Sequence, residues 1–188
     1  MKVDRQDLLK ITSRSELRAW LSRNYQTALQ AWVPYSTKPQ PGRVLYLDLV
    51  EEALCFGWID GLAKRYQGML LRRITPRRNQ NRWSELNKAR LKRLDQLGLV
   101  TTAGRAAMPK DKFTVDARVK KALEADSVAK ANFDRFPKLY QRIRIDNIQD
   151  ALRNHHEGTF HKRLDKLILY SKFNLMYGQW NDGGRLLR

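Results

Sequence analysis

The sequence has a single cysteine and no long apolar run, and both scarcities exclude classes of structure. Cys55, the one cysteine among 188 residues, cannot form an internal disulfide, and its apolar surroundings predict a small buried side chain. No apolar run approaches the ~20 residues that span a bilayer. The first residues, 1–7, lack the apolar core of a secretory signal, so we expect a cytoplasmic protein.

Motifs of common enzyme chemistries are also missing. The sequence has no Walker A loop, no Gly-x-Ser-x-Gly and no His-Glu-x-x-His. Its histidines, His155, His156 and His161, are spaced so that they do not share one helical face, which disfavours a metal site. We therefore expect no metal and no cofactor, and the sequence leans away from an enzyme.

Acidic residues are few, with 19 Asp and Glu against 37 Lys and Arg, a formal net charge of +18. Charge is also sorted along the chain. Residues 64–93 hold 11 basic side chains and one acidic side chain, Glu85, whereas residues 44–63 hold four acidic side chains and no basic one. A folded basic segment of this kind presents a focused positive field, which favours anionic partners. The alternative is that the charge only keeps the surface soluble.

Apolar periodicity predicts an α+β fold that is mainly helical. We expect an α/β part at residues 1–108, with a small antiparallel sheet, and a helical part at residues 115–178. Residues 109–114 read as a linker and residues 179–188 as a loose basic tail. The chain shows no internal repeat.

Turn and capping residues place the N-terminal elements. Ser13 with Glu16 fits a capping box for a helix that ends near Asn24. An alternating segment, 28–35, reads as a strand that Pro34 assigns to an edge or a strand end. The next signals predict a helix at 45–56, whose acidic side chains face away from its apolar side, and a turn at Asp60-Gly61. Two strands are expected around Gly68, the second ending at Pro76, followed by a loop at 79–81. A helix from Ser84 to Gly98 and a short helix capped by Thr101 or Thr102 complete this part.

The C-terminal part reads as a series of amphipathic helices. We expect Asp126 and Thr159 to act as helix caps. The predicted helices centre on residues 119–123, 128–136, 139–152 and 160–177.

Within the basic segment, guanidinium groups suit the recognition of phosphate oxygens, and the helix start at Ser84 adds free N–H donors. Trp83 could stack on a base or a ring beside them. The alternative is that Trp83 packs against the helix and the arginines decorate a loop. The predicted anion-binding residues are Arg72, Arg73, Arg77, Arg78, Arg82 and Lys88.

A pocket is a second hypothesis for the same region. Trp58, Asp60 and Arg77 flank the same two predicted strands, and Asp60 could act there as a general base. An Asp-Gly turn whose carboxylate neutralises neighbouring arginines is the alternative. The predicted pocket or stacking residues are Trp58, Asp60, Trp83, Ser84 and Asn87.

Three stretches carry a resemblance to a known family: Glu51–Gly61 (EEALCFGWIDG), Thr75–Arg78 (TPRR) and Asn81–Lys88 (NRWSELNK). With weaker likeness at 122–126 and 132–133, the chain resembles the YdeI/OmpD-associated, or bacteriocin-protection, family from about Ser13 to Lys172. The resemblance implies a small bacterial protein involved in tolerance of cationic antimicrobial peptides and in contact with an outer-membrane porin. It supplies no catalytic residues.

Three functions follow from these observations. The leading hypothesis is a non-catalytic domain that binds an anionic partner, with nucleic acid as first candidate, through its basic surface. The second is an enzyme or binding protein for a small anionic metabolite. The third, which rests on the family resemblance, is a protein-interaction factor in bacteriocin tolerance. The oligomeric state is left open.

Overall fold

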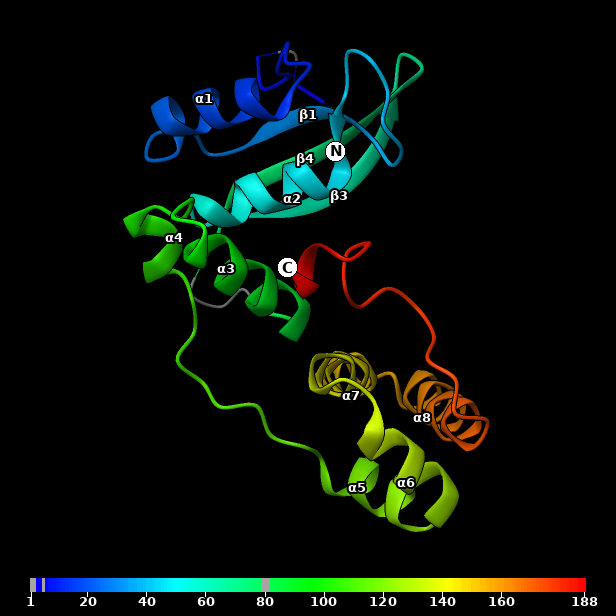
Figure 1. The fold of residues 1–188 in the computed structure, drawn as a ribbon. Helices are drawn as coiled ribbons and strands as arrows, with labels where there is room; N and C mark the ends of the chain where they lie inside the picture. Colours follow the sequence, from blue (N-terminus) through cyan, green and yellow to red (C-terminus); the bar gives the residue numbers. More distant parts are fainter. Residues whose placement is uncertain (1–2, 5, 79–81) are drawn as a thin grey trace. The chain divides into compact units, whose positions relative to one another are not determined.

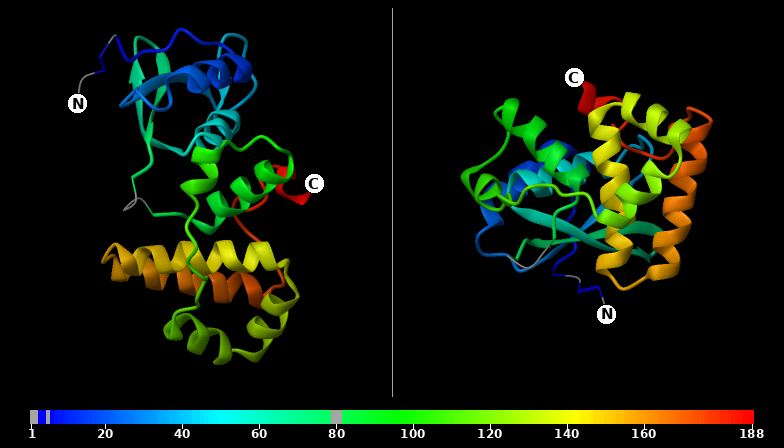
Figure 2. Two further views of the ribbon diagram at one scale, coloured as in Figure 1. Left: turned by 90° about the vertical axis from the view of Figure 1, so that its left-hand side faces the viewer. Right: turned by 90° about the horizontal axis from the view of Figure 1, so that it is seen from below.

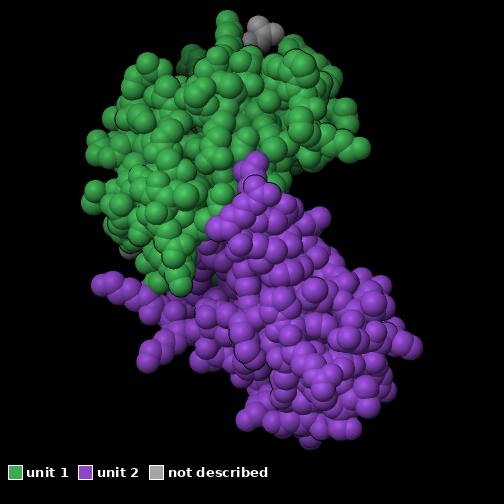
Figure 3. Space-filling model, viewed as in Figure 1, with its two compact units in different colours: residues 1–83, 90–109 green, residues 84–89, 110–188 purple. Residues whose placement is uncertain are grey.

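The computed structural model describes residues 3–4, 6–78 and 82–188 (Figure 1). Its described part contains eight α-helices and one four-stranded sheet, so the predicted class, α+β and mainly helical, is confirmed. The loop predicted at 79–81 lies outside the described residues. The chain divides into two compact units, residues 1–83 with 90–109 and residues 84–89 with 110–188 (Figure 3).

Unit 1 holds the sheet and the helices that pack on it. Its elements are α1 (Arg14–Asn24), β1 (Ala31–Ser36), β2 (Val44–Leu45), α2 (Tyr46–Cys55), β3 (Trp58–Tyr66), β4 (Met69–Pro76), α3 (Glu85–Gln96, whose first residues group with unit 2) and α4 (Thr102–Ala106). Leu17 and Leu21 of α1, Leu49 of α2 and Ile74 of β4 are fully buried in one core.

The sheet has the order β2-β1-β4-β3. The β1–β4 and β3–β4 pairs are antiparallel, as predicted, but the short β2 pairs parallel to β1, so the sheet is mixed. Pro34 lies in β1, an inner strand. It is tolerated there because β2 pairs with β1 only at Tyr35 and Ser36, so no ladder bond to β2 is needed at Pro34.

The two strands predicted around Gly68 form the β3–β4 hairpin. Gln67 and Gly68 both have positive φ, 46° and 75°, as a two-residue hairpin turn of the primed type requires. The turn predicted at Asp60-Gly61 is wrong. β3 runs through both residues, and the Asp-Gly pair lies at an irregularity of register between Asp60 and Ala63, where glycine commonly marks a bulge.

Helix caps follow the sequence closely in unit 1. The Ser13 hydroxyl accepts a hydrogen bond from the Glu16 N–H at 3.3 Å, and Thr101 caps α4 by accepting from the Gly104 N–H at 3.2 Å. Gly57, at φ 72°, ends α2 in the left-handed region that favours glycine.

The acidic face of α2 was predicted to point to solvent, and this is wrong. Glu51 and Glu52 are 2% and 1% exposed. Arg14 donates to both carboxylates at 2.7 Å and Arg18 donates to Glu52 at 2.8 Å. Burial of these charges is possible because each is paired and hydrogen-bonded, which the spacing along α2 alone cannot reveal.

Unit 2 contains the remaining helices, α5 (Ala117–Glu124), α6 (Ser127–Arg135), α7 (Lys138–Arg153) and α8 (Glu157–Lys172), and the 3-10 helix η1 (Arg185–Leu187). In both views of Figure 2, α7 and α8 run side by side, and Tyr140, Phe160 and Leu167 lie in their shared core. Asp126 caps α6, as predicted, by accepting from the Ala129 N–H at 3.0 Å.

Two details of unit 2 differ from the sequence expectations. Thr159 does not cap α8, because that helix already begins at Glu157 after His156. The tail at 179–188 was predicted to be loose, but it contains η1 and its Asp182 is buried. The Trp180 ring of this tail packs edge-on against Tyr140, with 5.8 Å between the ring centroids. None of the helices in the described part of the chain is long and apolar enough to cross a membrane.

Candidate anion-binding site

Trp58 is part of the unit 1 core. Its side chain is 1% exposed, its Nε1 donates to the Tyr25 carbonyl at 3.1 Å, and its ring meets Trp20 edge-on at 5.8 Å. An indole with its N–H satisfied and its faces packed has no free surface for a ligand.

Asp60, Arg72 and Tyr46 form a closed polar cluster on one side of the sheet. Arg72 donates to Asp60 Oδ2 from Nε at 2.9 Å and from Nη2 at 2.6 Å, and the Tyr46 hydroxyl donates to the same oxygen at 3.0 Å. Burial raises the pKa of Tyr46, and the Asp60 charge adds to that effect. Burial opposes the charge on Arg72, but the hydrogen bonds and charge of Asp60 give it a raised pKa. The Arg72 charge is thus balanced within the protein.

Arg77 lies over the face of Trp83, with its guanidinium carbon 4.0 Å from the ring centroid. Trp83 is only 7% exposed, so this face of the indole is already occupied. Arg77 Nη1 donates to the Arg82 carbonyl at 3.0 Å, while Nε and Nη2 are buried without a hydrogen-bond partner in the described part of the chain. Burial lowers the pKa of Arg77 to about 10, against a smaller opposing effect of the Asp60 charge.

The other predicted residues fall into two groups. Arg73, Arg78 and Arg82 belong to unit 1, and each has an interaction within the protein. The last three predicted residues, Ser84, Asn87 and Lys88, group with unit 2.

Ser84, Asn87 and Lys88 all make their contacts at the start of α3. The Ser84 hydroxyl accepts from the Asn87 N–H at 3.2 Å, which is the predicted cap. Lys88 Nζ lies 3.0 Å from Glu85 Oε1 and 2.9 Å from Asp111 Oδ2. The Lys88 charge is therefore also balanced by carboxylates, although its role in binding anions stays a prediction.

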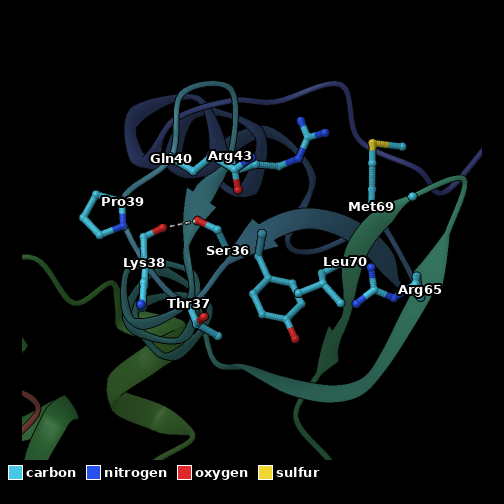
Figure 4. Close-up of a pocket in the computed structure, with 11 residues that line it drawn as sticks. Ser36, Thr37, Lys38, Pro39, Gln40, Arg43, Arg65, Met69 and Leu70 are labelled. Carbon is cyan, nitrogen blue, oxygen red and sulfur yellow. Dashed lines mark hydrogen bonds between the residues drawn. The ribbon is translucent and has the colours of Figure 1, made fainter.

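Unit 1 has a basic pocket that the sequence did not single out. It lies between the loop that follows β1 and the β3–β4 hairpin, and its volume is about 430 Å³. Figure 4 shows Lys38 and Arg43 on the loop side and Arg65 on the hairpin side. Tyr35 and Leu70 add apolar surface to its lining.

The cations of this basic pocket, unlike Arg72 and Lys88, are not balanced by carboxylates of the described residues. Its lining includes Lys38, Arg43 and Arg65 and no Asp or Glu. Arg43 donates to the Gly42 carbonyl at 2.6 Å, and none of the three cations has a carboxylate partner within the described residues. The Ser36 hydroxyl donates to the Lys38 carbonyl at 2.6 Å and so ties the loop to the end of β1.

Strand pairing places Lys38, Arg43 and Arg65, from distant parts of the sequence, in the lining of one pocket. β2 pairs with the end of β1, which folds residues 37–43 into a loop, and Arg65 sits opposite Leu70 in the hairpin. A signal was present, since Lys38 and Arg43 flank a Pro- and Gly-rich loop and Arg65 precedes the hairpin turn. The 37–43 loop and the β3–β4 hairpin turn meet because of the strand order, which the sequence alone does not reveal.

A second hollow, of about 540 Å³, lies beside the N-terminal part of α1. Its lining includes Arg14 and Arg18, which bond Glu52, and Arg93, which lies 3.5 Å from Glu51. Since these cations already hold buried carboxylates, the basic pocket is the stronger site for an external anion.

The fold and this pocket define a basic α+β protein of two units, the first of which presents an open cavity lined by cations. Residues 9–107 match the family model of a domain of unknown function, DUF8412, and residues 112–172 match the family model described as Bacteriocin-protection, YdeI or OmpD-Associated. Because the DUF8412 model covers just over half of the chain, the chain belongs to that family, and residues 112–172 of unit 2 are similar to the bacteriocin-protection, YdeI or OmpD-associated family.

The second match confirms the predicted resemblance over residues 112–172. The stretches at 122–126 and 132–133 fall inside the second match, while the longer stretches between residues 51 and 88 fall inside the first. No curated protein and no solved structure matches the chain.

Proposed function

We propose that unit 1 binds an anionic partner at the basic pocket, with nucleic acid as the first candidate. The observation that carries this proposal is the set of three cations, Lys38, Arg43 and Arg65, that share one cavity without a carboxylate partner in the described residues. Elsewhere in unit 1, guanidinium groups pair with carboxylates, as at Arg14 and Arg72. Cations that line one concavity without a carboxylate partner attract phosphate oxygens, because no internal anion competes for them there.

Two exposed arginines that follow the end of β4 away from the hairpin turn add positive charge elsewhere on unit 1. Arg78 and Arg82 are exposed and belong to this unit. The two tryptophans of the predicted site are buried, which favours recognition of a backbone of phosphates over stacking of bases on indole rings. Binding of this kind is independent of sequence and weakens as salt rises.

A fluorescence-anisotropy titration with generic single-stranded RNA and DNA, repeated at several salt concentrations, tests the proposal. We expect log K to fall linearly with log[salt]. Each phosphate contact contributes a slope of about −0.7 on single strands, so replacing Lys38, Arg43 and Arg65 by Gln together reduces the slope by about 2.

The matched control removes three exposed lysines from unit 2, by Lys110→Gln, Lys112→Gln and Lys121→Gln. It lowers the net charge by the same amount and retains the slope if the basic pocket carries the binding. Circular dichroism melts check that both triple variants fold. The proposal fails if the wild type shows no binding at low salt, or if both triple variants lose the same part of the slope.

The concavity of the basic pocket also favours a small anionic metabolite as ligand. Its volume of about 430 Å³ lies in the range of small-molecule sites, and Tyr35 with Leu70 offers apolar contact beside the cations. A thermal-shift screen of phosphorylated and carboxylated metabolites tests this candidate, since a ligand that binds only the folded state raises the melting temperature.

The description of the family that unit 2 matches offers another candidate, a part in bacteriocin protection. Comparing survival of cells with and without the intact chain under bacteriocin challenge tests it. Equal survival of the two strains counts against it.

A further inference from the structure

We infer that the basic pocket recognises a phosphate monoester, a terminal phosphate group, in preference to the phosphodiesters inside a nucleic-acid strand. This inference rests on the proposed function of the same pocket and names its ligand class. The chemistry could come from the phosphorylated end of an oligonucleotide or from a small phosphorylated metabolite.

The charge of the basic pocket fits a dianion. Lys38, Arg43 and Arg65 bring three positive charges to one cavity, and no acidic side chain lines it. A phosphate monoester carries about −1.5 to −2 charges near neutral pH and offers three terminal oxygens, whereas an internal phosphodiester carries one charge. A cavity lined by three cations and no carboxylate is therefore better balanced by a monoester than by a diester.

The shape of the basic pocket supports the same ligand. Residues 36–43 bound it on one side and the hairpin bounds it on the other, while Tyr35, which is 9% exposed, and Leu70 contribute apolar lining (Figure 4). Between these walls a chain end or a free molecule can place its phosphate near the cations and its remainder against the apolar lining. A strand bound through an internal phosphate must also leave the cavity, as along an open groove.

Two arginines and one lysine also suit an oxygen-rich group. The forked donors of Arg43 and Arg65 can each meet two phosphate oxygens, and the Lys38 ammonium acts as a point charge. The Ser36 hydroxyl donates a 2.6 Å hydrogen bond to the Lys38 carbonyl, which ties the loop that presents Lys38 to the end of β1.

The experiment measures affinities for one short RNA with a 5′-phosphate and the same RNA with a 5′-hydroxyl, and for AMP against adenosine. We expect the 5′-phosphorylated RNA to bind about tenfold more tightly, the effect of roughly one added charge-assisted hydrogen bond. The triple variant at Lys38, Arg43 and Arg65 should lose this preference, and the unit 2 control variant should keep it.

The outcomes separate this inference from the proposed function. Equal affinity for the two RNAs, with binding that depends on Lys38, Arg43 and Arg65, overturns the monoester inference and leaves anion binding in place. Binding of AMP but of neither RNA supports the monoester and assigns the source to a small metabolite. Failure of every probe to bind overturns the inference together with the proposed function.

Discussion

The guanidinium of Arg77 lies 4.0 Å from the ring centroid of Trp83, while two of its nitrogens, Nε and Nη2, are buried with no hydrogen-bond partner in the described residues. A buried charge that is only partly satisfied costs stability, and an apolar side chain of similar length removes that cost. We expect Arg77→Met to leave the free energy of unfolding within about 1 kcal/mol of the wild type, since the lost stacking offsets part of the gain.

Arg72→Met, five residues earlier, is the matched control. It removes the partner of Asp60, a largely buried carboxylate, and should lower the free energy of unfolding by about 2 kcal/mol. Urea unfolding followed by circular dichroism measures both variants. A larger loss for Arg77→Met than for Arg72→Met would contradict this interpretation of the two arginines.

Alkaline pH gives a separate test of Arg77. Burial lowers the folded-state pKa of Arg77 to about 10, well below its ordinary value, so the folded state releases this proton before the unfolded state does. The contribution of Arg77 to the free energy of unfolding therefore becomes more favourable as pH increases through about 10. The difference in unfolding free energy, wild type minus Arg77→Met, should be more positive at pH 10.5 than at pH 8. An unchanged difference would mean that the guanidinium stays charged.

The carboxylates of α2 depend on Arg14, which contacts Asp48, Glu51 and Glu52 at once. Arg14→Gln leaves the two buried glutamates with less compensation and should cost about 3 kcal/mol of unfolding free energy. The double-mutant cycle with Glu52→Gln should show a coupling of about 1–3 kcal/mol.

Arg105→Gln is the control for this prediction. Arg105 pairs with Asp95 at 2.7 Å, but both side chains are about half exposed, so its loss should cost less than about 1 kcal/mol. Equal costs for Arg14→Gln and Arg105→Gln would show that the buried cluster adds nothing beyond a surface pair.

Local signals in the sequence predicted most of the elements. Ser13, Thr101 and Asp126 cap the helices expected of them, and Gly68 lies in the expected hairpin turn. These signals depend on backbone groups within a few residues, which a sequence displays directly. The same reasoning failed at Asp60-Gly61, because strand pairing with β4 overrides the turn preference of the two residues.

The candidate site was harder to predict, because charge in a sequence does not show its partner. Arg72 and Lys88 looked like open cations, yet Asp60, Glu85 and Asp111 balance them. The open cations, Lys38 and Arg65, are separated in sequence and meet only through the pairing of β1, β2 and the hairpin. Whether the arginines predicted from the basic segment bind an anion stays a prediction.

Cys55 should be inert in the folded protein. It is fully buried, and burial raises the pKa of its thiol to about 11. Since the thiolate is the reactive form, only about one thiol in a thousand is ionised at pH 8, and that thiol is shielded from reagents. We expect labelling by Ellman's reagent to proceed only as fast as the protein unfolds, and to be complete within minutes once the protein is denatured in guanidinium. Rapid labelling without denaturant would contradict the packing of α2 described above.

Gly104 marks the closest approach of α4 to the end of α2. A Cβ at this position would lie 2.3 Å from the Cys55 carbonyl oxygen, a backbone atom that also accepts hydrogen bonds from Thr101. Because neither helix can yield without losing those bonds, Gly104→Ala should lower the free energy of unfolding by about 2–4 kcal/mol.

Gly158 is the control for Gly104, because it lies in α8 and a Cβ added there would meet no described atom within 4 Å. Gly158→Ala gains helix propensity and should raise the free energy of unfolding by about 0.5–1 kcal/mol. Thermal and urea unfolding of the two single variants give opposite signs if α4 packs on α2 as described. A neutral or stabilising Gly104→Ala would require α4 to sit farther from the Cys55 carbonyl.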